Sequence, residues 1–191
     1  MLRRPIVTLL LLITVTAVNG PTATWAAQQN ADSREIAKDR QSLEAGKSRI
    51  KQLSHLIDLW HDANLKGDQS KIDQLAQQLE EMLHRDMDAT ARAISQAQAE
   101  KARSAREFHR GHRHWSEKVD DKRDLSDDIH DADQLRETLK VKKRLAASIS
   151  KSPAFSNRYR LLGDYMDVMR HEVGMTRLEL AEDIGELDQD R

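Results

Sequence analysis

Residues 152–187 read SPAFSNRYRLLGDYMDVMRHEVGMTRLELAEDIGEL, and this stretch decides the fold. Apolar or near-apolar side chains recur in it every three or four residues, at Phe155, Tyr159, Leu162, Met166, Met169, Val173, Thr176, Leu180, Ile184 and Leu187. A strand would alternate at every second residue, so this spacing predicts a long α-helix with one buried face. Ser152 suits the N-cap and Pro153 the first helical position, so we expect the helix to begin there.

Three more segments with the same periodicity precede this helix. The first is expected to begin at Asp32 or Ser33, where Asp32 and Glu35 resemble a capping box. Its predicted buried face consists of Ile36, Leu43, Ile50, Leu53, Ile57 and Trp60. Residues 64–68 form a turn in which Gly67 can take the left-handed conformation, and Ser70 can cap the second helix. The third helix is expected over residues 116–149.

The connection between the second and third helices has two interpretations. Gly111 costs a continuous helix only about 1 kcal/mol, so the chain could run straight through it. That single helix would approach about 80 residues, far longer than ordinary globular helices. We therefore expect a turn near Gly111, with Ser116 capping the third helix.

Four long helices with short connections predict an all-α fold. Sequential helices joined by short loops pack as antiparallel neighbours, which gives an up-down-up-down four-helix bundle or coiled-coil rod. One elongated domain over residues 32–188 accommodates all four. Large apolar residues give way to alanine between Ala97 and Ala105, so this half should bury less apolar area.

The N-terminus has the layout of a secretory signal peptide. Arg3 and Arg4 form a basic start, an uncharged apolar run follows from Ile6 to Val18, and small residues at Thr24 and Ala26 suit a cleavage site. An uncleaved membrane anchor is the alternative, but a spanning helix needs about 20 apolar residues. We therefore expect a signal peptide over residues 1–26, cleavage near Ala26, and a flexible N-terminus at 27–31. The mature protein would lie in the periplasm or be secreted, without a transmembrane anchor.

Charge and cysteine content exclude several classes of partner. The 191-residue chain has a net charge of −1, and cleavage would remove two arginines and no acid, leaving −3. Nucleic-acid binding usually needs a strong basic excess, so we expect none. The absence of cysteine excludes disulfides and thiolate metal sites. We expect no cofactor.

The predicted turn carries the most unusual surface of the sequence. Its candidate partner-binding residues are Arg106, His109, Arg110, His112, Arg113, His114 and Trp115. They suit an acidic partner, a weak contact with an anionic surface, or a transition metal held by His112 and His114. Alternatively, Phe108 and Trp115 close the end of the bundle while the arginines pair with neighbouring helices.

No catalytic motif is present in the sequence. Three carboxylate-x-x-His pairs occur: Asp58–His61, Glu81–His84 and Asp127–His130. Di-iron ligands point into the bundle from the buried faces, but Asp58 and Glu81 lie off the apolar faces. The segment 171–175 resembles a zinc-protease helix but has Met175 in place of the second histidine. We therefore expect an exported, non-enzymatic scaffold or chaperone-like protein that binds a protein partner or a second copy. The alternative is a metal-handling bundle that uses surface histidines.

Overall fold

A computed structural model describes the backbone of residues 21–109 and 115–189, and most side chains between 33 and 185. It contains four α-helices: α1 (Pro21–Lys66), α2 (Gln69–His109), α3 (Trp115–Lys151) and α4 (Phe155–Gln189). No strand occurs in these two ranges. The predicted all-helical bundle is confirmed.

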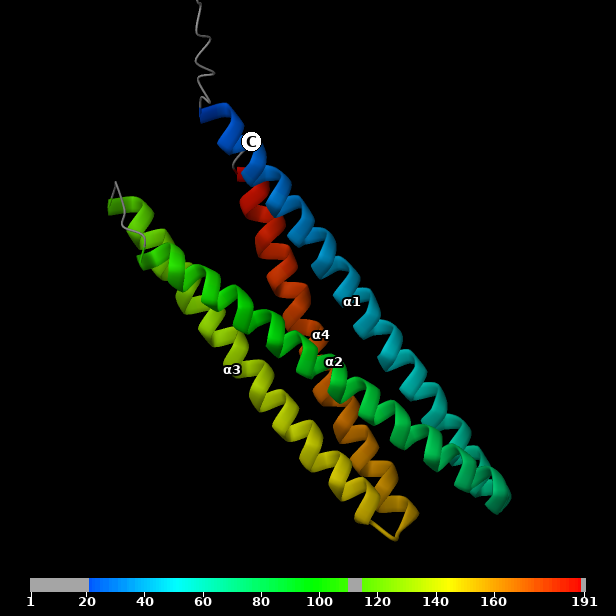
Figure 1. Ribbon diagram of the computed structural model, residues 1–191. Helices are drawn as coiled ribbons and strands as arrows, with labels where there is room; N and C mark the ends of the chain where they lie inside the picture. Colours follow the sequence, from blue (N-terminus) through cyan, green and yellow to red (C-terminus); the bar gives the residue numbers. More distant parts are fainter. Residues whose placement is uncertain (1–20, 110–114, 190–191) are drawn as a thin grey trace, which may run out of the picture.

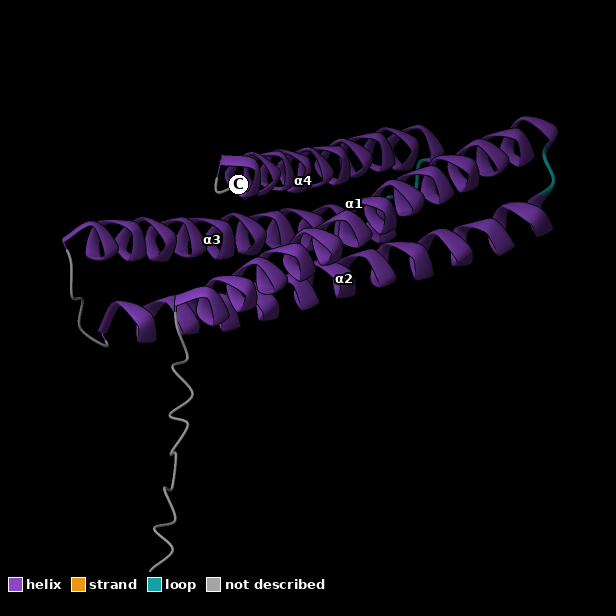
Figure 2. Cartoon of the chain, turned by 90° about the horizontal axis from the view of Figure 1, so that it is seen from above, coloured by secondary structure: helices purple, strands orange, loops and turns teal. Residues whose placement is uncertain are grey.

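Each helix packs against the next one in the chain, and α4 packs back against α1. Figures 1 and 2 show the four long helices running alongside one another. Residue numbers rise along α1 while they fall along α2: Lys38 lies beside Glu100, and Arg49 lies beside Asp86. In Figure 1 the pair α1/α4 separates from the pair α2/α3 toward the end marked C. At the opposite end the main apolar core joins the helices, and we call this the closed end.

The turn between α1 and α2 follows the sequence prediction, with one correction. Gly67 has a φ of 67°, and the Gly67 and Asp68 amides donate to the carbonyls of Asn64 and Ala63 at 3.1 Å each. This is a Schellman motif, which needs a left-handed residue after the helix. The cap of α2 is Asp68 instead of Ser70: its Oδ1 accepts from the Lys71 amide at 3.1 Å.

The observed ends of α1, α2 and α4 can be compared with the predicted helix boundaries. Helix α1 begins at Pro21 instead of at Asp32 or Ser33, so the segment 27–31, expected to be flexible, is helical. Proline suits the first helical position, and the alanines and glutamines at positions 26–29 have high helix propensity. Residues 1–20 lie outside the described part, and the signal peptide stays a prediction. Helix α2 ends at His109, α3 starts at Trp115, and the two helices pack together, so the chain reverses direction between them as predicted. Ser116 lies inside α3 and is not its cap. Helix α4 begins at Phe155, where the Ala154 carbonyl accepts the first helical hydrogen bond, so Ser152 is not its cap.

The main apolar core fills the closed end of the bundle. It joins Leu53, Ile57 and Trp60 of α1 with Leu79 and Leu83 of α2 and with the first half of α4. The contributing α4 residues are Leu162, Tyr165, Met166 and Met169. Tyr165, which was missing from the predicted face, is fully buried, whereas Tyr159, which was included, is 41% exposed. The predicted faces are otherwise confirmed here.

The other half of the bundle has much less apolar packing. A second cluster contains Ile36, Leu43 and Leu180, all between α1 and α4. On α2 and α3 the buried apolar residues of this half are only Ala97 and Ala132 among those described. Because alanine buries little area, hydrophobic burial holds the two helix pairs together more weakly here. This difference leaves space between the pairs.

None of the described helices has the long, nearly uncharged apolar run that crossing a membrane requires.

Candidate functional site

A buried cluster of charged and hydroxyl side chains lies where the main core ends. Its members come from all four helices: Arg49, Asp86, Thr90, Lys142, Tyr165 and Glu172. We call this cluster the polar clasp. Lys142 is 0% exposed and Asp86 is 1% exposed. Burial of such groups is tolerated only when each charge has partners, so the bonds within the clasp decide its stability.

The hydrogen bonds of the clasp satisfy both buried charges. Lys142 Nζ lies 2.7 Å from Asp86 Oδ2, donates to Thr90 Oγ1 at 2.9 Å, and also forms an ion pair with Glu172. Arg49 Nε donates to Asp86 Oδ1 at 3.0 Å. The Tyr165 hydroxyl donates to Asp86 Oδ2 at 3.1 Å, and burial raises the pKa of Tyr165 far above its ordinary value. Two cations thus face two anions, and the clasp is neutral.

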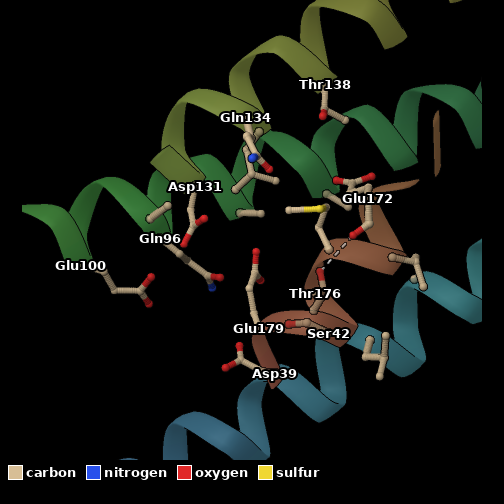
Figure 3. Close-up of a pocket in the computed structure, with 18 of the residues that line it drawn as sticks. Asp39, Ser42, Gln96, Glu100, Asp131, Gln134, Thr138, Glu172, Thr176 and Glu179 are labelled. Carbon is tan, nitrogen blue, oxygen red and sulfur yellow. Dashed lines mark hydrogen bonds between the residues drawn. The ribbon is translucent and has the colours of Figure 1, made fainter. Parts of the chain in front are cut away.

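Beyond the clasp the helices surround a cleft of about 1790 Å³. Its lining comes from residues 38–49 of α1, 89–104 of α2, 123–141 of α3 and 167–185 of α4. Figure 3 shows Glu179 of α4 and Asp131 of α3 pointing toward each other across this space, with Asp39 of α1 nearby. The cleft occupies the place where the apolar core of a four-helix bundle would continue.

The cleft is acidic. Eleven carboxylates line it, against five lysine or arginine side chains. Burial is the main cause that raises the pKa of Glu179 to about 7, and the charges of Asp131, Asp39, Asp183 and Glu182 raise it further. Burial also raises the pKa of Asp39, Asp128 and Asp131. Carboxylates that face one another in partly dehydrated surroundings attract protons or cations.

Glu179→Gln should increase thermal stability at alkaline pH. The pKa of Glu179 is about 7 in the fold and 4.5 ordinarily, so the folded state binds the proton more tightly. The stability that this proton gives is present below pH 4.5 and is lost as the pH rises to about 7. Glutamine removes this loss. We expect the variant to melt a few degrees above wild type near pH 8 and at the same temperature near pH 4.5.

The matched control is Glu81→Gln, which makes the same chemical change at an exposed position of α2 outside the cleft. Its melting temperature should follow that of wild type at both pH values. Equal melting curves for Glu179→Gln and wild type at pH 8 would show that Glu179 is hydrated normally.

Three of the predicted partner-binding residues are described, and they lie where α2 ends and α3 begins: Arg106, His109 and Trp115. Arg106 is exposed, and its Nε donates to the Ala102 carbonyl one turn back on α2 at 2.9 Å. His109 is exposed, and its ring contacts that of Phe108 at 5.5 Å between centroids. Trp115 is the first residue of α3. Arg110, His112, Arg113 and His114 lie outside the described residues. The role of this surface stays a prediction.

The three carboxylate-x-x-His pairs do not combine into one metal-binding group among the described residues. Glu81 pairs with Arg85 on its own helix at 3.3 Å, and a ring nitrogen of His130 contacts Gln134. His61 packs between the rings of Phe155 and Tyr159. Within residues 21–109 and 115–189, no three histidines, aspartates or glutamates are grouped so that they could hold a metal ion.

Sequence reasoning missed the polar clasp. Lys142 belongs to a basic run, residues 140–144, of the kind that commonly lies in the C-terminal part of a helix as favourable charge. One signal was available: Lys142 lies three residues after Leu139 and three before Leu145, so it occupies the buried face of α3. A lysine on an apolar face needs a buried anion, but the sequence does not show which one.

Comparison of the chain with protein-family models, with curated proteins and with solved structures gives no match.

Proposed function

We propose that this chain is an exported, non-catalytic interaction protein with scaffold or chaperone-like activity, and that the acidic cleft is its binding surface. The observation that carries the proposal is the cleft itself, a hollow lined by all four helices where the main apolar core does not continue. A bundle selected for stability alone would fill this space, because each buried leucine-sized side chain contributes about 1.5–3 kcal/mol. An unfilled interior suits a protein that receives a segment of another.

The occupant that fits best is an α-helix with one basic and one apolar face. Its basic face would meet the excess of carboxylates around Glu179 and Asp131. Its apolar face would meet Leu43, Val173 and Met175, which also line the cleft. Complementary charge steers association and excludes partners of the wrong sign.

The length of the cleft agrees with a helix of ordinary size. The lining residues of α4 extend from Asp167 to Gly185, a rise of about 27 Å at 1.5 Å per residue. A partner helix of about 18 residues would span this distance. An amphipathic helix laid between others is a common mode of protein recognition.

A synthetic peptide tests this proposal directly. A fluorescent amphipathic helix of about 18 residues, with lysine on one face and leucine on the other, is titrated with the protein while anisotropy is recorded. We expect it to bind at least about tenfold more tightly than the same peptide with glutamate in place of lysine. The difference should shrink at high salt because salt screens charge.

Paired variants distinguish binding in the cleft from unspecific attraction to an acidic surface. Glu179→Gln combined with Asp131→Asn should weaken binding of the basic peptide about three- to tenfold, since each cation pair contributes up to about 1 kcal/mol. Glu81→Gln combined with Asp88→Asn removes the same charges from exposed positions of α2 outside the cleft. This control should bind as wild type does. Equal affinity for both peptides, or equal losses in both double variants, would contradict the proposal, and preferential formation of a dimer would identify a second copy as the occupant.

A further inference from the structure

We infer that the polar clasp sets the width of the cleft by joining the two helix pairs at its inner end, with Lys142 as a positioning residue. Glu172 belongs to both features, because it pairs with Lys142 and also lines the cleft. Arg49 does the same on α1, pairing with Asp86 and lining the cleft. The layer of side chains between the main core and the cleft is therefore ionic instead of apolar. The half of the bundle that contains the cleft is called the open half below.

Most bonds of the clasp cross from one helix pair to the other. Lys142 of α3 binds Glu172 of α4, and the Thr90 hydroxyl of α2 donates to Glu172 Oε1 at 2.8 Å. Tyr165 of α4 and Arg49 of α1 both donate to Asp86 of α2. These bonds tie α1/α4 to α2/α3, and Lys142 Nζ is the atom that contacts the carboxylates of both sides.

Ionic contacts suit this position for a physical reason. The hydrophobic effect is non-directional, so apolar contacts fix the spacing of two helix pairs less tightly than directional bonds between charged groups do. Buried charges must keep their hydrogen bonds, and even a small displacement of one pair leaves a charge without its partner. The clasp thus permits one spacing of the helices at the point where they separate.

Breaking the clasp should change the cleft before it changes the core. In Lys142→Met the apolar stem is retained while the charge is lost, so Asp86 and Glu172 repel each other across the boundary between the pairs. We expect the distance between α2 and α4 to become longer and more broadly distributed in the open half. The closed end is held by the main core, so its distances should stay unchanged.

Distances between spin labels measure this effect, and the chain offers a clean background because it has no cysteine. One pair of labels is placed at Ala99→Cys and Arg177→Cys, both exposed in the open half. A second pair is placed at Gln78→Cys and Asn157→Cys, both exposed at the closed end. Pulsed dipolar spectroscopy on the full chain then compares wild type with Lys142→Met.

The control substitution is Lys143→Met, at the exposed neighbour of Lys142 on the same helix. It should leave both distance distributions as they are in wild type. Lys142→Arg keeps the positive charge and should restore a single narrow distribution in the open half, which loss of stability alone would not explain. An unchanged open-half distribution in Lys142→Met would overturn the inference, and so would equal broadening at both ends. The cleft width is measured without any ligand; its bearing on binding rests on the proposed function, which failure of the peptide titration would refute separately.

Discussion

Asp86→Ala should lower the free energy of unfolding by roughly 3–5 kcal/mol, the usual cost of removing one partner from a buried ion pair. Asp86 is 1% exposed and accepts from Arg49 and Tyr165 while it pairs with Lys142 at 2.7 Å. Alanine leaves the buried ammonium of Lys142 with Glu172 as its remaining anion. Denaturant unfolding followed by circular dichroism measures the change.

Two further variants show whether the loss of stability comes from the buried ion pair. Asp88→Ala makes the same change two residues later on α2, at an exposed position, and should shift stability by less than about 0.5 kcal/mol. Asp86→Leu combined with Lys142→Met replaces the pair by apolar groups and should recover much of the loss. If Asp86→Ala matched Asp88→Ala in stability, Asp86 would be hydrated and the clasp would not exist as described.

Leu162→Asp should destabilise the protein even more, by about 4–5 kcal/mol or enough to prevent folding. Leu162 is 1% exposed and lies in the main core among residues of α1, α2 and α4. Aspartate there loses the burial of leucine and places a charge inside an apolar cluster. Thermal melting and denaturant titration, both followed by circular dichroism at the helical band, measure the loss.

The same substitution at Leu178 provides the control. Leu178 lies on the same helix and is 62% exposed, so Leu178→Asp should cost only the difference in helix propensity, about 0.5 kcal/mol. A comparable loss at both positions would mean that aspartate harms α4 wherever it stands. A native melting curve for Leu162→Asp would remove Leu162 from the core.

Much of the helical core follows from the spacing of apolar residues alone. Leu53, Ile57 and Trp60 were predicted on one face, and all three are buried. Aromatic residues were harder, since Tyr165 is buried although it lies outside the predicted row, and Tyr159 is largely exposed. A tyrosine can bury its ring only where its hydroxyl finds a partner, and the partner of Tyr165 is Asp86, 79 residues away in sequence.

The charged surface near the turn is visible in the sequence, and the cleft is not. The run of arginine and histidine from Arg106 to Trp115 is conspicuous in the sequence, whereas the cleft is formed by carboxylates scattered over four helices. Asp39, Asp131 and Glu179 look like ordinary solvated acids when each helix is considered alone. Burial between the helices is the main cause that raises their pKa values, and burial is a property of the folded chain.

The sequence by itself determined that this protein is helical, where its buried faces lie at the closed end, and that it turns at Gly67. These features depend on neighbours within a few residues, because one helical turn brings residues three and four apart onto the same face. Tertiary structure alone decided the ion pairs of Lys142, the burial of Tyr165 and the cleft around Glu179. Each depends on contacts between helices, whose relative position is set by the packing of the whole bundle rather than by any local pattern.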